Sequence, residues 1–138
     1  MIEGEWDPFN RNCPSRQLLD RIGDRWTALI IEALGDQTLR FSALATAVGG
    51  ISQKMLTQTL RSLERDGFVR RTSYPVVPPH VEYQLTELGA SLHETLRALS
   101  GWAVENMDTV AQQQADYDAL VDAQRSASEQ HADQRKAG

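Results

Sequence analysis

Apolar positions recur at helical spacing through the first half of the chain. Proline suits the first helical position, so we expect a helix to begin at Pro14 with Cys13 as its N-cap. Two further amphipathic helices follow, one that ends at Gly35 and a short one whose apolar side chains lie between 41 and 48. The residues between them, 38–40, suit a short extended segment.

A fourth helix is expected after the turn formed by residues 49–51. Ser52 is a favourable N-cap, and the helix runs to Asp66 before Gly67 stops it. The spacing of the apolar residues then changes from helical to alternating, which predicts strands over 68–74 and 81–85.

The segment 75–79 contains three prolines, which cannot sit inside a paired sheet, so it forms the extended tip of a hairpin.

A fifth helix is predicted after Thr86, and its apolar residues continue at spacings of three and four, which is typical of a seam against a partner helix. After residue 121 the chain becomes polar, and we expect it to fray or to extend as a solvated helix. The predicted dimer contacts are Leu92, Leu96, Leu99, Trp102, Ala103, Met107, Val110, Tyr117 and Val121.

This order of elements predicts an α+β fold of the winged helix-turn-helix type. Three helices form the core, a two-stranded hairpin forms the wing, and the chain adds further helices at both ends. We expect an N-terminal arm over 1–12, the DNA-binding domain over 13–100, and a dimerisation helix with a polar tail over 101–138.

Composition excludes several classes of protein. The chain has 138 residues, 41% of them apolar and 24% charged, as in an ordinary globular domain. One cysteine and three scattered histidines predict no metal site, no cofactor is expected, and the common enzyme signatures are absent. Without a long apolar run or a leader, we expect a cytoplasmic protein that is not an enzyme and has no membrane partner.

The net charge of -5 is unevenly distributed along the chain. The first ten residues and the segment 101–138 are acidic, whereas residues 52–75 carry five bases and two acids. Such a balance argues against a nonspecific coat on nucleic acid, but it leaves room for a small basic face that touches phosphate. An ordinary solvated surface would also fit the charge pattern.

The fourth helix carries the functional prediction. Its leucines face the core, and the residues on the opposite side are Lys54, Gln58, Arg61 and Arg65. Arg and Lys can bind guanine or phosphate, and Gln can pair with adenine, so this side suits the major groove of double-stranded DNA. Glu64 and Asp66 could instead neutralise Arg61 and Arg65.

The predicted DNA-binding residues fall into two groups. Base contacts are assigned to Lys54, Gln58 and Arg61, with Gln53 and Thr57 assisting; phosphate or wing contacts are assigned to Ser52, Arg65, Arg70, Arg71 and His80. A winged-helix module that binds proteins without DNA contact is the alternative function.

Several motifs resemble the HxlR-type bacterial transcriptional regulators. They are Cys13-Pro14, Gly23-Asp24-Arg25-Trp26, Leu39-Arg40-Phe41-Ser42, ISQKMLTQTLRSLERDG from residue 51, and VPPHVEYQLTELG from residue 77. The resemblance covers residues 13–100. It implies a homodimeric repressor or activator on an inverted-repeat operator, with dimerisation through the first and last helices.

Several members of that family use a cysteine at the place of Cys13 to sense oxidants or electrophiles. A thiol at a helix N-cap with Arg11 and Arg16 nearby favours the reactive thiolate. An oxidant or a small molecule could then act as inducer, through a Cys13–Cys13 disulfide in the dimer, a mixed disulfide or alkylation. The other interpretation is a small apolar N-cap packed under the arm.

Overall fold

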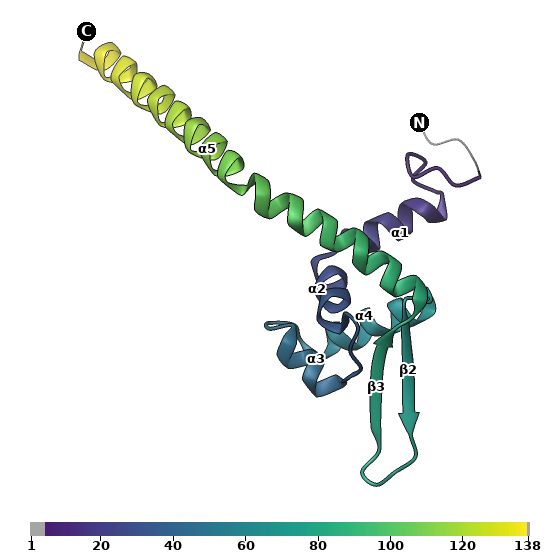
Figure 1. Cartoon of the computed structure of the whole chain (residues 1–138). Coiled ribbons are helices and arrows are strands. Elements are labelled where there is room, and N and C mark those ends of the chain that lie inside the picture. The colour runs from purple at the N-terminus through teal and green to yellow at the C-terminus, as the bar shows by residue number, and fades with distance from the viewer. Residues whose placement is uncertain (1–4, 138) are drawn as a thin grey trace. The chain divides into compact units, whose positions relative to one another are not determined.

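The structure is a computed structural model that describes residues 5–137. The chain divides into two compact units, Met1–Ala98 and Leu99–Gly138. The elements in chain order are α1 (Pro14–Ile22), α2 (Arg25–Leu34), β1 (Leu39–Arg40), α3 (Phe41–Ala47), α4 (Gln53–Arg65), β2 (Val69–Tyr74), β3 (His80–Leu85) and α5 (Glu87–Ala137) (Figure 1).

The first unit is built around α2, α3 and α4, whose apolar sides form one core. The leucines of α4 at 56, 60 and 63 are at most 2% exposed, as their spacing predicts. The start of the wing and the first turns of α5 complete this core, whose buried members are Ile30, Ile31, Leu34, Leu44, Val48, Leu56, Leu60, Leu63, Phe68, Val69, Tyr83 and Leu96.

Both ends of α4 are fixed by local signals. The Oγ of Ser52 accepts a hydrogen bond of 3.0 Å from the backbone N–H of Met55, which confirms the predicted N-cap. At the other end Gly67 has φ +84°, a left-handed conformation that favours glycine and ends the helix. The helix therefore begins and ends where the sequence predicts.

The sheet has three antiparallel strands in the order β1-β3-β2. Leu39 lies opposite Tyr83 and Arg40 opposite Glu82, so the short segment predicted at 38–40 adds a third strand to the two-stranded wing that we expected. The hairpin of β2 and β3 has the predicted proline-rich tip, where the side chain of Val77 is 99% exposed (Figure 1).

The first turn of α5 packs directly against the base of the wing. A Cβ on Gly89 would clash with the backbone oxygen of Phe68, so no larger residue fits without a shift. Thr86 connects the same two elements by hydrogen bonds. Its Oγ1 accepts from the N–H of Gly89 at 3.1 Å and donates to the carbonyl of Gly67. The wing and α5 are thus locked together within the first unit.

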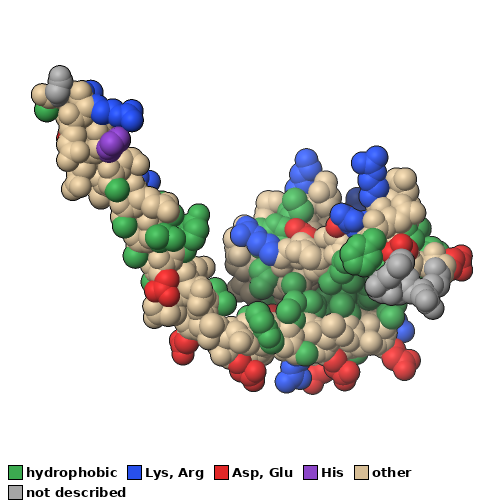
Figure 2. Space-filling model, turned by 90° about the horizontal axis from the view of Figure 1, so that it is seen from above, with side chains coloured by type: hydrophobic (Ala, Val, Ile, Leu, Met, Phe, Trp, Pro, Cys, Tyr) green, Lys and Arg blue, Asp and Glu red, His purple; other side chains and the backbone are tan. Residues whose placement is uncertain are grey.

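In the second unit, α5 continues without a break to Ala137, so the polar segment after Val121 is helical rather than frayed. Figure 2 shows apolar side chains exposed at intervals along the helix of the second unit. None of the helices within residues 5–137 contains an apolar stretch that could span a lipid bilayer.

Candidate nucleic-acid interface

The outward side of α4 carries the stripe that the sequence predicts. Lys54, Gln58, Arg61 and Arg65 are all exposed, and on a helix of 3.6 residues per turn they fall within roughly 60° of one another. No acidic residue lies in the first turn of α4, so its positive dipole end is free of a local carboxylate. We call these four residues the α4 stripe.

A hollow between α4 and the wing lies along one flank of the stripe. Side chains alternate along a strand, which turns Arg71 to the same face as Val69 and Tyr83. This wing-side hollow is lined by Gln53, Thr57, Leu60, Arg61 and Glu64 of α4, by Phe41, and by Arg71, Val81 and Tyr83 of the wing. Two predicted cations, Arg61 and Arg71, therefore line the same hollow from different elements.

The other flank of the stripe has the opposite charge. There Gln58 and Ser62 of α4 line a second hollow together with Asp20 and Arg21 of α1 and Asp24, the N-cap of α2, so its acidic side chains outnumber its basic one. Because carboxylates repel phosphate, the two flanks offer different surfaces to a nucleic-acid backbone. The cationic flank is the one beside the wing.

Arg65 lies at the far end of the stripe, beside α1. It lines a hollow with Leu18 and Arg21 of α1 and with Leu88 of α5. In the same hollow Arg21 forms an ion pair with Asp66, the residue that caps the C-terminus of α4. The carboxylate of Asp66 is therefore paired with Arg21, 45 residues earlier in the chain. Within residues 5–137 no ion pair joins Asp66 to Arg65.

Arg70 and His80 lie on the other face of the wing. Arg70 alternates with Arg71, so the two neighbouring arginines point to opposite faces. The ring of His80 stacks on Tyr74 with centroids 4.6 Å apart, and its Nε2 lies 3.4 Å from the carboxylate of Glu82. A hydrogen bond with Glu82 also raises the pKa of Tyr74. The structure thus separates these two residues from the wing-side hollow.

Two hydroxyls near the leading end of α4 keep hydrogen-bonding capacity. Ser52 accepts from Met55, which leaves its own proton free to donate. Thr57 donates at 2.9 Å to the carbonyl of Gln53, which leaves its oxygen free to accept. Of the two, Ser52 is the one suited to a phosphate oxygen.

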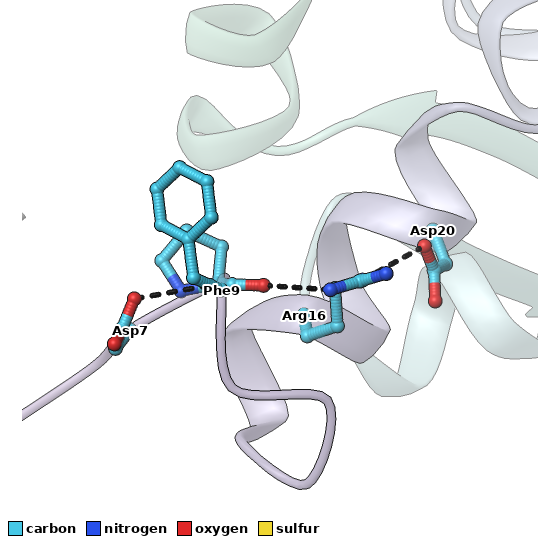
Figure 3. Close-up of polar contacts among 5 residues, drawn as sticks. Asp7, Phe9, Arg16 and Asp20 are labelled. Carbon is cyan, nitrogen blue, oxygen red and sulfur yellow. Dashed lines mark hydrogen bonds and ion pairs between the residues drawn. The ribbon is translucent and has the colours of Figure 1, made fainter. Parts of the chain in front are cut away.

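Cys13 is 9% exposed and its sulfur accepts two hydrogen bonds. The hydroxyl of Ser15 donates to Sγ at 3.1 Å and the N–H of Asp7 at 3.3 Å, and in that order they lower the pKa of the Cys13 thiol. The guanidinium of Arg16 instead contacts the carbonyl of Pro8 and the carboxylate of Asp20 (Figure 3). The predicted direction of the shift is retained, but Ser15 and Asp7 cause it rather than the arginines.

The predicted dimer contacts differ in how far their own chain covers them. Leu96 is 6% exposed and belongs to the core, so its side chain is buried within the first unit and is not available to a second copy. Leu92 packs against the same core and is half-buried, and Val121 is also partly covered. The exposed members are Leu99, Trp102, Ala103, Met107, Val110 and Tyr117.

Sequence reasoning missed three features of this region. The alternation within β2 was available as a signal to separate Arg70 from Arg71. By contrast, the pairing of Arg21 with Asp66 and the contact of the Asp7 amide with Cys13 depend on how the chain folds back. Across residues 5–137 no cluster of three or more His, Cys, Asp or Glu side chains could hold a metal ion.

Comparison with known proteins places this geometry among regulators. The model of the HxlR-like helix-turn-helix family matches residues 21–111. The chain is 49% identical over 106 residues to the uncharacterised HTH-type transcriptional regulator YtfH of Escherichia coli (strain K12), covering 77% of this chain and 84% of that protein.

Solved structures give the same result. The putative transcriptional regulator ytfH from Salmonella typhimurium superposes with a TM-score of 0.74 at 49% identity, over 80% of this chain and 98% of that one. The redox regulator HypR in its oxidised form superposes with a TM-score of 0.61 at 39% identity, over 68% of this chain and 97% of that one.

Proposed function

Because this chain belongs to the HxlR-like helix-turn-helix family, it is a helix-turn-helix transcriptional regulator, and we propose that it represses transcription as a homodimer on an inverted-repeat operator. The exposed α4 stripe carries the proposal. Cations and an amide project from a capped helix whose other side is sealed in the core, and this is the arrangement that a helix in the major groove requires.

The α4 stripe supplies the base contacts. Lys54, Gln58 and Arg61 meet base edges, and Gln53 and Thr57 assist from the adjoining flank. Side chains at the edges of the stripe meet the backbone or the minor groove, and these are Ser52, Arg65, Arg70, Arg71 and His80. Arg71 acts beside α4, whereas Arg70 and His80 act from the other face of the wing.

The dimer is supported by apolar side chains that the chain itself leaves uncovered. Leu99, Trp102 and Tyr117 are each more than half exposed on a helix that has no other element in its unit. A second copy would cover them and place two α4 helices about one duplex turn, ~34 Å, apart. Operators with two-fold symmetry follow from that arrangement.

Selection of duplexes from a random pool by the purified protein tests this function. We expect enrichment of an inverted repeat with half-sites about 10 base pairs apart, and an affinity that falls steeply as salt rises, because phosphate contacts release counterions. A pool without enrichment, or a partner bound without salt dependence, would overturn the proposal in favour of a winged-helix protein-interaction module.

We further propose that an oxidant or electrophile acts as inducer through Cys13. The observation in favour is the lowered pKa of its thiol, held by Ser15 and Asp7. Diamide accepts two electrons and two protons from two thiols as their disulfide forms, here between two copies of Cys13 or with a small thiol. Diamide should weaken operator binding in the parent protein and not in Cys13→Ser; equal responses would exclude the thiol as sensor.

A further inference from the structure

The hollow that Arg65 lines lies between α1, the end of α4 and the start of α5, and its volume is about 680 Å³. We call it the α1–α5 hollow. All of its lining residues belong to the first unit, so it lies within one compact body. Pockets of roughly 300–1,000 Å³ hold small ligands in proteins. The α1–α5 hollow is therefore large enough for a small organic molecule.

Apolar side chains from three parts of the first unit line this hollow. Phe68, which precedes the wing, is 6% exposed, and Ile22 of α1 and Leu92 of α5 are partly buried. Leu18 of α1 and Leu88 of α5 stay open to water, with 36% and 54% of their surface exposed. Because exposed apolar surface gains free energy when an apolar body covers it, the hollow favours a ligand with such a body.

The charged side chains of the hollow leave one cation without a partner. Arg21 and Asp66 form an ion pair, so their charges offset each other. Arg65 is exposed and forms no ion pair with any residue from 5 to 137. A guanidinium binds a carboxylate through two parallel, charge-assisted hydrogen bonds. The hollow thus combines a binding group for one carboxylate with an apolar lining.

We infer that the α1–α5 hollow binds a small organic acid, whose carboxylate meets Arg65 and whose apolar body covers Leu18 and Leu88. An inorganic anion would satisfy the guanidinium but would leave the leucines exposed, and a neutral apolar molecule would leave the guanidinium unpaired. Leu92 is also a predicted dimer contact, so a second copy of the chain is the competing occupant that the experiment has to exclude.

Arg65 connects this site with the α4 stripe. It is the last member of the stripe, where it is assigned to the DNA backbone. A carboxylate bound to Arg65 removes that phosphate contact, so the acid and the operator oppose each other, and each weakens the binding of the other by the same factor. This consequence rests on the proposed function, whereas the binding of the acid itself does not.

Isothermal titration calorimetry of the full chain with 4-phenylbutyrate, and with the neutral 4-phenylbutyramide, tests the site. We expect the parent to bind one acid per chain and to bind the amide about 3- to 10-fold more weakly, because the amide lacks the charge-assisted contact. Arg65→Gln should bind acid and amide alike. Leu88→Gln should weaken both ligands, since it removes apolar cover. Arg97→Gln removes an equal charge from outside the hollow and should change neither affinity.

A gel shift with saturating 4-phenylbutyrate then tests the link to DNA. The acid should weaken operator binding about 3- to 10-fold in the parent, as the loss of one phosphate contact predicts, and should have no effect on Arg65→Gln.

The outcomes separate the site from the proposed function. A parent that binds the acid but no operator overturns the proposed function and supports the site. A parent that binds its operator but not the acid, or that binds acid and amide alike, overturns the site. If sedimentation shows that the acid binds only as the dimer dissociates, the hollow belongs to a second copy and the inference is wrong.

Discussion

The two compact units of the chain differ in how far their apolar side chains are buried. In the first unit Ile30, Leu56 and Leu63 are fully buried. In the second unit Leu99 and Trp102 are 62% and 59% exposed, because a single helix has no interior. The first unit can therefore stabilise itself and display charge outward, whereas the second gains from apolar burial only when another surface covers it.

Removal of one leucine from each unit tests this contrast most strongly. Leu60→Ala opens a cavity in the core and should lower the free energy of unfolding by about 2–5 kcal/mol. Leu120→Ala removes a side chain that is 56% exposed and should change it by less than about 0.5 kcal/mol. Urea denaturation measures the free energy of unfolding of both variants. Repeating it at several protein concentrations and extrapolating to high dilution gives the values for the monomer. Equal losses would break the comparison.

The interior of the first unit is the part of the structure that the sequence predicts best. Leucines at 56, 60 and 63 recur at helical spacing, and Ser52 and Gly67 mark both ends of α4 by local chemistry. These signals lie within a few residues of their effects. After Val121 the sequence left two alternatives open, a frayed end or a solvated helix, because a polar segment without an apolar stripe gives no sign that the helix continues; the structure has the helix.

The exposed side of α5 should respond in assembly rather than in folding. We expect Trp102→Ala to weaken dimerisation by about 2 kcal/mol, or roughly 30-fold in the dissociation constant, because buried tryptophans dominate interfaces. Val104→Ala is the matched control, since Val104 is 78% exposed but lies on the other side of the helix. Sedimentation equilibrium measures both, and an equal loss in the two variants would contradict the predicted seam.

On the outside of the first unit, function and folding should separate. Arg61→Ala is expected to reduce operator binding by about 1–3 kcal/mol and to leave the unfolding transition in place, because the side chain of Arg61 is exposed. Arg97→Ala, which removes an exposed cation from α5, should leave binding unchanged. A gel-shift titration decides, and equal effects would mean that net charge rather than the α4 stripe governs affinity.

At the site, the sequence predicts which residues of one helix are exposed, but it does not predict contacts between segments that lie far apart in the chain. The spacing of Lys54, Gln58 and Arg61 predicts an outward face, and all three are exposed. The pairing of β1 with β3 joins a two-residue strand to residues more than forty positions later, and two residues carry too little pattern to announce it. The partner of Asp66 was likewise hidden, because Arg21 belongs to another helix.

A smaller effect is expected at the start of α4. Ser52→Ala removes the side-chain oxygen that accepts from Met55 and should cost about 1 kcal/mol of unfolding free energy. Ser52→Asn restores an accepting oxygen and should recover most of this loss. Thermal denaturation of both variants is the measurement. If Ser52→Ala is as stable as the parent, the packing of α4 and not its cap fixes where the helix begins.

The smallest expected effect concerns α1, the part of the first unit that most resembles the second, since none of its residues is fully buried. The Ser15 hydroxyl is the leading cause of the lowered pKa of Cys13, so Ser15→Ala should move the pH dependence of Cys13 alkylation upward and slow the reaction near neutral pH, where less thiolate is present. Arg16→Gln should leave that dependence in place, because the guanidinium contacts Pro8 and Asp20 and not the sulfur. Alkylation rates with iodoacetamide across a pH series, with Cys13→Ser as the blank, measure the difference. If the pH dependence of alkylation shifts in Arg16→Gln and not in Ser15→Ala, then the neighbouring arginine rather than the Ser15 hydroxyl lowers the pKa of Cys13.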